Sequence, residues 1–186
     1  DISGPDGVPD GKIDSHDRTI IGNPTPRYEF GLTLGLQWKG IDFSAFFQGV
    51  GKKDVYYSGA GARALCGNYT IYKYQFDYWT PENPDAKFPR LLEDPNATNP
   101  NNMISSFWVK SGAYCRLKNI VLGYTLPSSI TKAAHISKLR VYASAQNLFT
   151  IKDNFYEGFD PENSVSSGAS LYPLNKTFVF GLNVEF

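Results

Sequence analysis

The chain has 186 residues, and its 18 basic and 18 acidic side chains cancel. A neutral chain of this length can form one domain, and it has no basic excess that would favour nucleic acid as a partner. No apolar run approaches the roughly 20 residues of a membrane-spanning helix. These features leave a β-barrel membrane protein open, because the strands of such a barrel alternate apolar and polar residues.

Residues 1–26 are rich in Asp, Gly and Pro and predict a loop at the start of the chain. The carboxylates from Asp6 to Asp17 approximate the spacing of an EF-hand calcium loop. The pattern departs from it at two positions: Val8 offers no side-chain ligand, and Asp17 stands where an EF-hand has a Glu. We expect one structural Ca²⁺ in this loop and no organic cofactor. The alternative is an Asp/Gly turn whose side chains cap its own backbone. The expected oxygen donors are the side chains of Asp6, Asp10, Asp14 and Asp17 and the carbonyl of Lys12.

The clearest strand pattern lies in residues 27–49, which predict a hairpin. Every second residue from Tyr28 to Trp38 is apolar, the period of a strand with one apolar face. A two-residue turn at 39–40 would place Trp38 opposite Ile41 and pair apolar residues along both strands. The expected outward set is Leu32, Leu34, Leu36, Phe43, Ala45 and Phe47, and the expected inward set is Thr33, Gln37 and Ser44.

The length of this hairpin favours a membrane. From Tyr28 to Trp38 the strand rises ten steps of about 3.3 Å, or roughly 33 Å. At a tilt of about 40° this projects to roughly 25 Å, the height of the apolar band of an outer-membrane barrel. Four aromatic residues at predicted strand ends would then lie in the membrane girdles: Tyr28, Trp38, Tyr124 and Phe186.

Two further strands are predicted within residues 112–149, and a closing strand over 176–186. In the first of them the apolar alternation is clean from Ile120 onward and breaks upstream. That break predicts a β-bulge near Lys118 and Asn119, or an exit from the membrane at this point. The closing strand has one fully apolar face, made by Phe178, Phe180, Leu182, Val184 and Phe186.

The segments between the predicted strands alternate in length. Those at 39–40 and 127–137 are short, whereas 50–111 and 150–175 are long. Outer-membrane barrels have short periplasmic turns and long outer loops, so we expect the C-terminus on the periplasmic side. Five strands cannot close, and an open sheet in lipid leaves unpaired backbone groups, so we expect other strands to complete the barrel. Asp1 opens directly into a loop, which indicates that more chain precedes it.

Seven segments of the chain form a distinctive series: 17–26 (DRTIIGNPTP), 28–32 (YEFGL), 46–49 (FFQG), 78–84 (YWTPENP), 116–124 (RLKNIVLGY), 146–149 (QNLF) and 158–162 (GFDPE). In this order they resemble the closing section of the SusC/RagA-type TonB-dependent transporters of the Bacteroidetes outer membrane. The resemblance implies an all-β fold: the last five strands of a 22-stranded antiparallel barrel with a plug. It also implies energy from TonB through an N-terminal part absent here, a SusD-like lipoprotein lid, and import of oligosaccharides or peptides.

The long segment 50–111 is rich in aromatic residues, which either form a local core or present flat faces to a ligand. We expect Phe76, Tyr78 and Trp79 to pack the loop against itself, because Pro81 and Pro84 stiffen the adjoining turn. The residues expected to contact the ligand or the lipoprotein lid are Tyr69, Tyr72, Tyr74 and Trp108.

Rival functions are weaker on this sequence. A secreted, calcium-stabilised β-sandwich that binds glycans is the main alternative, and a passive porin is the next. No nucleophile motif is present, and the lone His16 and His135 lack a partner at zinc-ligand spacing, so we expect no enzyme. Cys66 and Cys115 permit one disulfide, but their spacing favours two free thiols.

Overall fold

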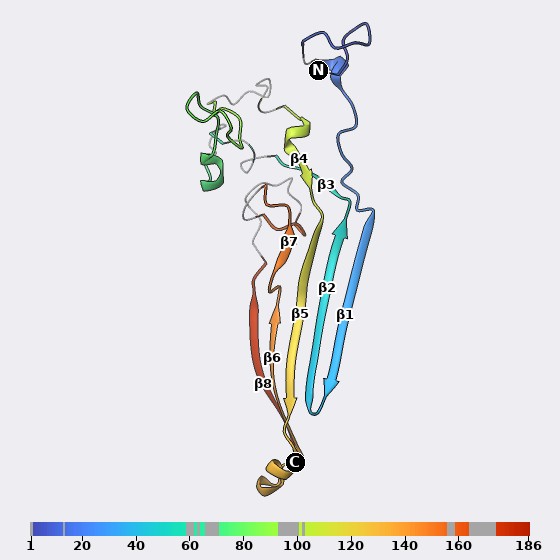
Figure 1. Cartoon of the computed structure of the whole chain (residues 1–186), viewed down its shortest axis with the longest axis vertical. Coiled ribbons are helices and arrows are strands. Elements are labelled where there is room, and N and C mark those ends of the chain that lie inside the picture. The colour runs from blue at the N-terminus through green and yellow to red at the C-terminus, as the bar shows by residue number, and fades with distance from the viewer. Residues whose placement is uncertain are drawn as a thin grey trace.

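Antiparallel strands dominate the chain, as the alternation predicts (Figure 1). The computed structural model describes residues 2–12, 14–58, 62, 64–65, 71–92, 101, 103–155, 159–163 and 174–186. One six-stranded sheet has the order β1-β2-β5-β6-β8, with β7 pairing to β5. The N-terminus and the long loops lie at one end of this sheet, here called the loop end. The β1–β2 turn, the short helix α1 (Ser128–Thr131) and the C-terminus lie at the other, the turn end.

The first two strands form the predicted hairpin. Strand β1 (Tyr28–Trp38) pairs with β2 (Ile41–Gly51), and Trp38 lies opposite Ile41, so the predicted register is confirmed. Lys39 and Gly40 both have positive φ, 46° and 86°. Two consecutive residues with positive φ form a hairpin turn whose twist matches that of the flanking strands. This match favours the turn even though its first residue, Lys39, is not a glycine.

A bulge changes the alternation in the next strand. Strand β5 (Tyr114–Thr125) pairs Asn119 with Phe46 but Leu117 with Phe47, so Lys118 is the extra residue. The predicted bulge near Lys118 is therefore confirmed. It brings Leu117 onto the face of Phe47 and turns Arg116 to the opposite face.

The second half of the sheet is built from β6 (Lys138–Gln146), the short β7 (Thr150–Lys152) and β8 (Thr177–Glu185). The prediction that one strand continues to Phe149 is wrong. Asn147 has a left-handed backbone with φ 52°, which ends β6 at Gln146. The chain rejoins the sheet at Thr150, where β7 pairs with the first residues of β5, beyond the part of β5 that pairs with β6.

The segment predicted as a loop over 50–111 begins and ends in regular structure. Strand β2 runs on to Gly51, and β3 (Asp54–Tyr56) and β4 (Val109–Ser111) form a separate two-stranded ribbon. The remaining elements are single turns of 3-10 helix: η1 (Ser15–Asp17), η3 (Lys73–Phe76), η5 (Ser106–Trp108) and η6 (Lys132–Ala134). Within the described residues, no helix is both long and apolar enough to cross a bilayer.

Rows of paired residues give the main sheet an apolar face and a polar face. One apolar row crosses all five long strands as Leu36–Phe43–Leu122–Ala143–Phe180. The neighbouring row on the opposite face reads Gln37–Asp42–Gly123–Tyr142–Gly181. Opposed residues share a face, so these rows separate apolar from mainly small and polar side chains.

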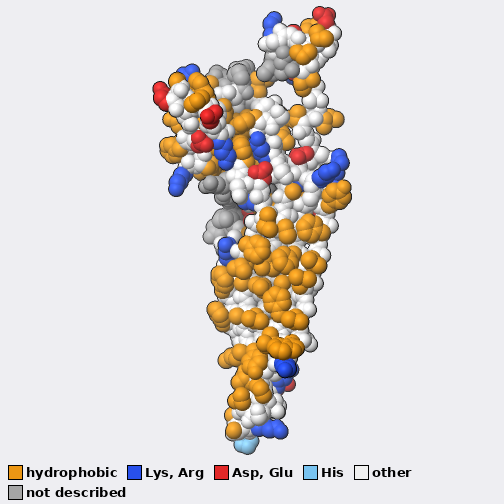
Figure 2. All heavy atoms as spheres, viewed as in Figure 1, with side chains coloured by type: hydrophobic (Ala, Val, Ile, Leu, Met, Phe, Trp, Pro, Cys, Tyr) orange, Lys and Arg blue, Asp and Glu red, His pale blue; other side chains and the backbone are white. Residues whose placement is uncertain are grey.

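The described part of the chain leaves the apolar face uncovered. Leu32 is 52% exposed and Phe180 82% exposed, although both lie in the middle of long strands. Figure 2 shows apolar side chains spread over the sheet, with charged ones gathered toward its two ends. The one buried hydrophobic cluster among the described residues lies at the loop end, around Phe88 and Trp108.

Close packing on the polar face depends on Gly181. A Cβ at this position would lie 2.3 Å from the Cζ atom of Tyr142, so the tyrosine ring occupies the space that a side chain would need. Gly35 is a matched strand glycine on the same face, and nothing lies within 4 Å of its Cβ position. We expect Gly181→Ala to destabilise the intact protein by about 1–3 kcal/mol through overpacking, and Gly35→Ala to have a much smaller effect.

This difference can be measured by unfolding the two variants in denaturant. The fraction folded is read from the heat-modifiable migration of the protein in gels. Equal stability of Gly181→Ala and Gly35→Ala would contradict the packing of Tyr142 over β8.

Candidate functional site

An ion pair crosses the polar face near the turn end. Arg140 on β6 donates from Nε to Asp42 Oδ1 on β2 at 2.8 Å and from Nη2 to Oδ2 at 2.5 Å. The strand between them contributes Gly123, where a Cβ would lie 2.5 Å from Arg140 Nη2. The guanidinium also lies 4.9 Å from the ring centroid of Tyr142. The glycine therefore lets a bidentate pair reach over a whole strand, which fixes β2, β5 and β6 in one register.

Sequence reasoning did not find this pair, although a signal was present. Asp42 and Arg140 lie 98 residues apart, so no local motif joins them. Both fall on the polar side of their alternating strands, and a glycine on β5 separates them. Given the strand order, the alternation pattern would have placed the opposite charges of Asp42 and Arg140 on either side of the glycine on β5.

The second candidate surface is an aromatic cluster at the loop end. Phe88 and Trp108 are buried there, and rings from two different loops pack around them. Trp108 Nε1 donates to the Asn101 carbonyl at 3.0 Å, which satisfies the indole inside the cluster. The surrounding rings are Tyr56, Tyr57, Tyr74, Tyr78, Phe107, Phe155 and Phe159.

The residues predicted to contact a ligand or lid are placed differently from one another. Trp108 is only 5% exposed, so its ring is a core group in this structure and the expectation that it faces a ligand is corrected. Tyr72 stacks on Tyr74 with ring centroids 5.7 Å apart and an interplanar angle of 6°. Burial raises the pKa of the Tyr74 hydroxyl, which fits a ring inside the cluster. Tyr69 lies outside the described residues.

Two aromatics expected to pack inward are exposed instead. Phe76 is 62% exposed and Trp79 is 40% exposed. The prediction that these two rings pack the loop against itself is therefore wrong, whereas Tyr78 does pack against the cluster. Among the aromatic residues of 71–92, Phe76 and Trp79 are accordingly the ones that offer ring faces to a partner.

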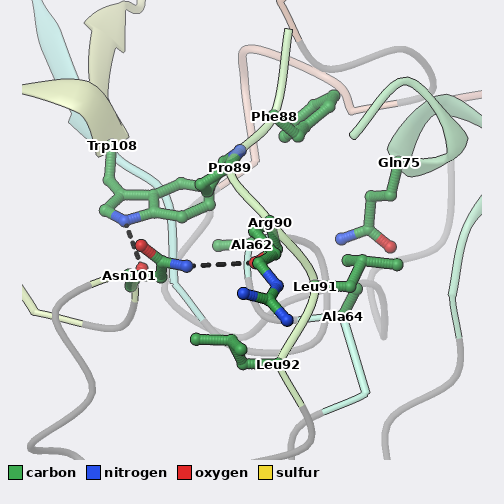
Figure 3. Close-up of a pocket in the computed structure, with 10 residues that line it drawn as sticks. All are labelled: Ala62, Ala64, Gln75, Phe88, Pro89, Arg90, Leu91, Leu92, Asn101 and Trp108. Atoms are coloured by element: carbon green, nitrogen blue, oxygen red, sulfur yellow. Dashed lines mark hydrogen bonds between the residues drawn. The ribbon is translucent and has the colours of Figure 1, made fainter. Parts of the chain in front are cut away.

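Figure 3 shows a cavity beside this cluster, with Trp108 on one side and Gln75 on the other. Its volume is about 30 Å³, which is room for roughly one or two water molecules and not for a sugar or peptide. Asn101 closes one edge, because its Nδ2 donates to the Arg90 carbonyl at 3.0 Å. The cavity is a packing feature of the cluster and does not serve as a substrate site.

The acidic N-terminal loop is folded on itself. Asp10 Oδ1 accepts from the Lys12 amide at 2.9 Å, and Asp14 Oδ1 accepts from the His16 amide at 2.8 Å. Asp17 accepts from the amides of Asp14, at 2.8 Å, and Ser3, at 3.1 Å, and also from that of Ile2. This is the self-capped turn allowed as the alternative. Within the described ranges no three His, Cys, Asp or Glu side chains gather at metal-binding distance. The calcium site stays a prediction.

The four residues expected at membrane girdles occupy strand ends of the apolar face. Trp38 and Tyr124 lie in one row at the turn end, both paired to Ile41. Tyr28 begins β1 at the loop end, and Phe186 follows the last residue of β8. Cys115 lies half-buried on β5, while Cys66 lies outside the described residues, so the disulfide question stays as the sequence left it.

The N-terminal loop makes a pH prediction. Three backbone amides lower the pKa of Asp17 from 3.8 to about 2. Because the folded pKa is the lower one, the stabilisation is complete above about pH 4 and is lost as the pH falls through about 2. We expect amide protection of residues 2–17 to fall over that window, as measured by hydrogen exchange.

Asp17→Asn should remove that pH dependence, whereas Asp6→Asn, a matched change in the same loop, should keep it. An unchanged pH profile in Asp17→Asn would exclude Asp17 as the residue that organises the loop.

No protein-family model matches the chain. Among curated proteins, TonB-dependent receptor P3 of Formosa agariphila is 34% identical over 193 residues, which cover 95% of this chain and 18% of that protein. TonB-dependent receptor SusC of Bacteroides thetaiotaomicron is 29% identical, with 95% of this chain and 17% of SusC covered. A chain in the open-open state of the RagAB peptide importer superposes with a TM-score of 0.66 at 29% identity, covering 89% of this chain and 18% of that one. The chain thus spans about a fifth of the length of the relatives it matches.

Proposed function

We propose, from its homology to a section of the TonB-dependent receptors, that this chain forms part of the wall and outer rim of an outer-membrane nutrient importer. The observation that carries the proposal is the pair of faces of the sheet. Apolar residues form continuous rows across β1, β2, β5, β6 and β8, and many of the large ones are exposed, while the other face carries mainly small and polar side chains. Lipid on one side and an aqueous lumen on the other satisfy both faces at once.

The orientation follows from the loops. In the proposal the loop end, with the aromatic cluster, faces the outside of the cell, and the turn end with the C-terminus faces the periplasm. Trp38 and Tyr124 then lie in the periplasmic aromatic girdle and Tyr28 in the outer one. Phe186 belongs to the periplasmic side.

The sheet needs partners at both edges. Strands β1 and β8 are the outer members of the sheet order, so each has one edge without a neighbour in the described part of the chain. Unpaired backbone groups in a bilayer cost several kcal/mol each, so further strands of the same protein pair with β1 and β8. In the proposal, a part of the same protein upstream of these residues carries the plug and the segment through which TonB supplies energy.

The substrate is an oligosaccharide or a peptide, taken up with a SusD-like lipoprotein. Support for a polar oligomer comes from the polar lumenal face and from the exposed rings of Phe76 and Trp79, since flat aromatic faces stack on sugars and peptides alike. The similarity to the RagAB peptide importer supports the peptide, and the oligosaccharide follows from the resemblance of the sequence motifs to the SusC/RagA-type transporters. The proposal includes no catalytic step.

The soluble sandwich is the less favoured function. A sandwich buries its apolar face against a second sheet about 10 Å away. Within the described residues the only other sheet is the β3–β4 ribbon, which has three residues in each strand. It is too small to cover the face that contains Leu34 and Phe180.

Calcium in the 1–17 loop is a separate proposal. Its support is the EF-hand-like spacing of Asp6, Asp10, Asp14 and Asp17. Binding would require the carboxylates to exchange their backbone partners for the ion, so calcium should change amide exchange in residues 2–17. Identical exchange with calcium and with chelator would remove the proposal.

The uptake function predicts a role for the exposed rings. Replacing Phe76 and Trp79 with Ala in the full-length importer should weaken substrate or lipoprotein binding about tenfold, as loss of aromatic contact residues does at interfaces. Uptake of labelled oligosaccharide or peptide by cells and lipoprotein affinity in detergent are the measurements. Ile104→Ala, an exposed apolar residue of the same loop, is the matched control. If both the double variant and the control behave like the natural protein, these rings are not contact residues.

The membrane assignment predicts an asymmetry between neighbours on β1. Leu34→Arg on the apolar face should cost about 2–4 kcal/mol, because it places a charge near the bilayer midplane. Thr33→Arg, one residue away on the polar face, should cost little. Folding of the full-length protein into lipid vesicles, titrated with urea, measures both, and equal costs would refute the assignment of faces.

A further inference from the structure

Four charged side chains meet at the loop end of β5. Arg116 Nη2 lies 2.7 Å from Asp160 Oδ2, and Arg116 Nη1 lies 2.9 Å from Glu162 Oε1. Lys118 Nζ lies 2.6 Å from Glu162 Oε2. Arg116 is 3% exposed, and its Nε donates to Thr150 Oγ1 at 2.7 Å. Two of the guanidinium nitrogens, Nε and Nη2, therefore make hydrogen bonds, whereas Nη1 and Glu162 Oε1 are close in charge but lack hydrogen-bond geometry. The buried cation is thus neutralised by two carboxylates, the pairing that a buried charge requires.

The ion pairs of Arg116 and Lys118 hold residues 159–163 against the polar face. The bulge at Lys118 turns Arg116 to the side of Gln48 and Thr150, with which it is paired. Lys152, two residues along β7, donates from Nζ to the Phe159 carbonyl. The segment is itself a tight turn, because Asp160 Oδ1 accepts from the Glu162 amide at 2.9 Å.

The same loop reaches the aromatic cluster. The Phe159 ring lies 6.0 Å from that of Tyr57 and 6.3 Å from that of Tyr74, both edge to face. The Phe155 ring lies 5.4 Å from that of Phe88 and 5.7 Å from that of Phe107.

Two lysines add to this contact. Lys110 Nζ lies 4.1 Å and Lys87 Nζ 4.8 Å from the Phe155 ring centroid, positions that favour cation–π attraction. The loop after β7 is thus joined by charges to the wall and by rings to the loop between β3 and β4.

We propose that Arg116 and Lys118 are positioning residues, and that their ion pairs with Asp160 and Glu162 form a clamp that sets the place of the whole aromatic cluster. While these ion pairs are intact, residues 153–155 and 159–163 hold the aromatic cluster against the loop end of the sheet. The loop after β7 and the loop between β3 and β4 then behave as one body. Resting on the proposed function, the clamp also fixes where the exposed rings of Phe76 and Trp79 stand relative to the lumen.

The physical basis is the buried arginine. Neutralising the carboxylates leaves the Arg116 charge buried and unpaired, so the segment 159–163 must move to let water reach it. Phe155 and Phe159 move with that segment and withdraw from Tyr74 and Phe88. The packing of residues 71–92 is therefore loosened as well. These residues make no ion pair with the clamp among the described contacts, so the effect reaches them through the aromatic rings.

The test is hydrogen exchange on the full-length protein in detergent, comparing Asp160→Asn/Glu162→Gln with the natural sequence. We expect amide exchange in residues 71–92 and 103–108 to become about tenfold faster or more, with residues 28–51 unchanged. Asp153→Asn is the matched control, since it removes a carboxylate of the same loop that takes no part in the ion pairs of Arg116 and Lys118, and the Asn oxygen can still accept from the Phe155 amide. Lys118→Gln, at a partly exposed site, should give a smaller change in the same regions.

Faster exchange confined to 159–163, or an equal effect of Asp153→Asn, would overturn the clamp. If the double variant fails to assemble, Lys118→Gln decides by the same criterion. Exchange is measured without transport, so a failed clamp is distinguishable from a failed importer: loss of the proposed function would show as absent uptake in the natural protein with the exchange pattern intact.

Discussion

Alternation across directly paired strands is the constraint on which the rest of this structure depends. In a paired sheet, a slip of one residue would transfer every side chain to the other face, so five long strands must agree on register. They do agree, and two of the glycines on the polar face show how. Gly123 lets Asp42 reach Arg140 over a strand, and Gly181 leaves room for the Tyr142 ring. Both contacts would be lost if the register slipped.

The bulge at Lys118 interrupts this alternation and thereby places a charged residue on the polar face. It changes the alternation once, between the part of β5 whose apolar residues alternate cleanly and its loop end. On the loop-end side of the bulge, Arg116 lies on the polar face, and this buried cation pairs with Asp160 and Glu162 of a loop more than 40 residues away in the sequence. A local backbone irregularity thereby links the wall of the proposed barrel to its outer rim.

Sequence reasoning predicted the parts that alternation controls. The hairpin register, the turn at 39–40 and the bulge all follow from side-chain period and turn chemistry, and all are present. It did not predict that β6 ends at Gln146, because the left-handed residue that follows, Asn147, is neither glycine nor part of a recognised turn. The short β3–β4 ribbon was also missed, since three-residue strands carry too little pattern.

The loop aromatics could not be sorted from the sequence for a different reason. Trp108 is buried in a cluster that the Phe155 and Phe159 rings reach from another loop, whereas Phe76 lies outside that cluster and is exposed. No local period reports such a meeting, and proline positions alone suggested the opposite assignment. The acidic loop was ambiguous in the same way, because the same carboxylates can serve an ion or their own backbone.

The central claim is that one face of this sheet contacts lipid and the other an aqueous lumen. Its most direct test is nitroxide accessibility at positions 43 to 46 of β2, in the full-length protein reconstituted in vesicles. The account predicts alternation: labels replacing Phe43 and Ala45 should be quenched by oxygen dissolved in lipid, and those replacing Ser44 and Phe46 by a water-soluble nickel complex. Uniform accessibility to the aqueous reagent along all four positions would contradict it.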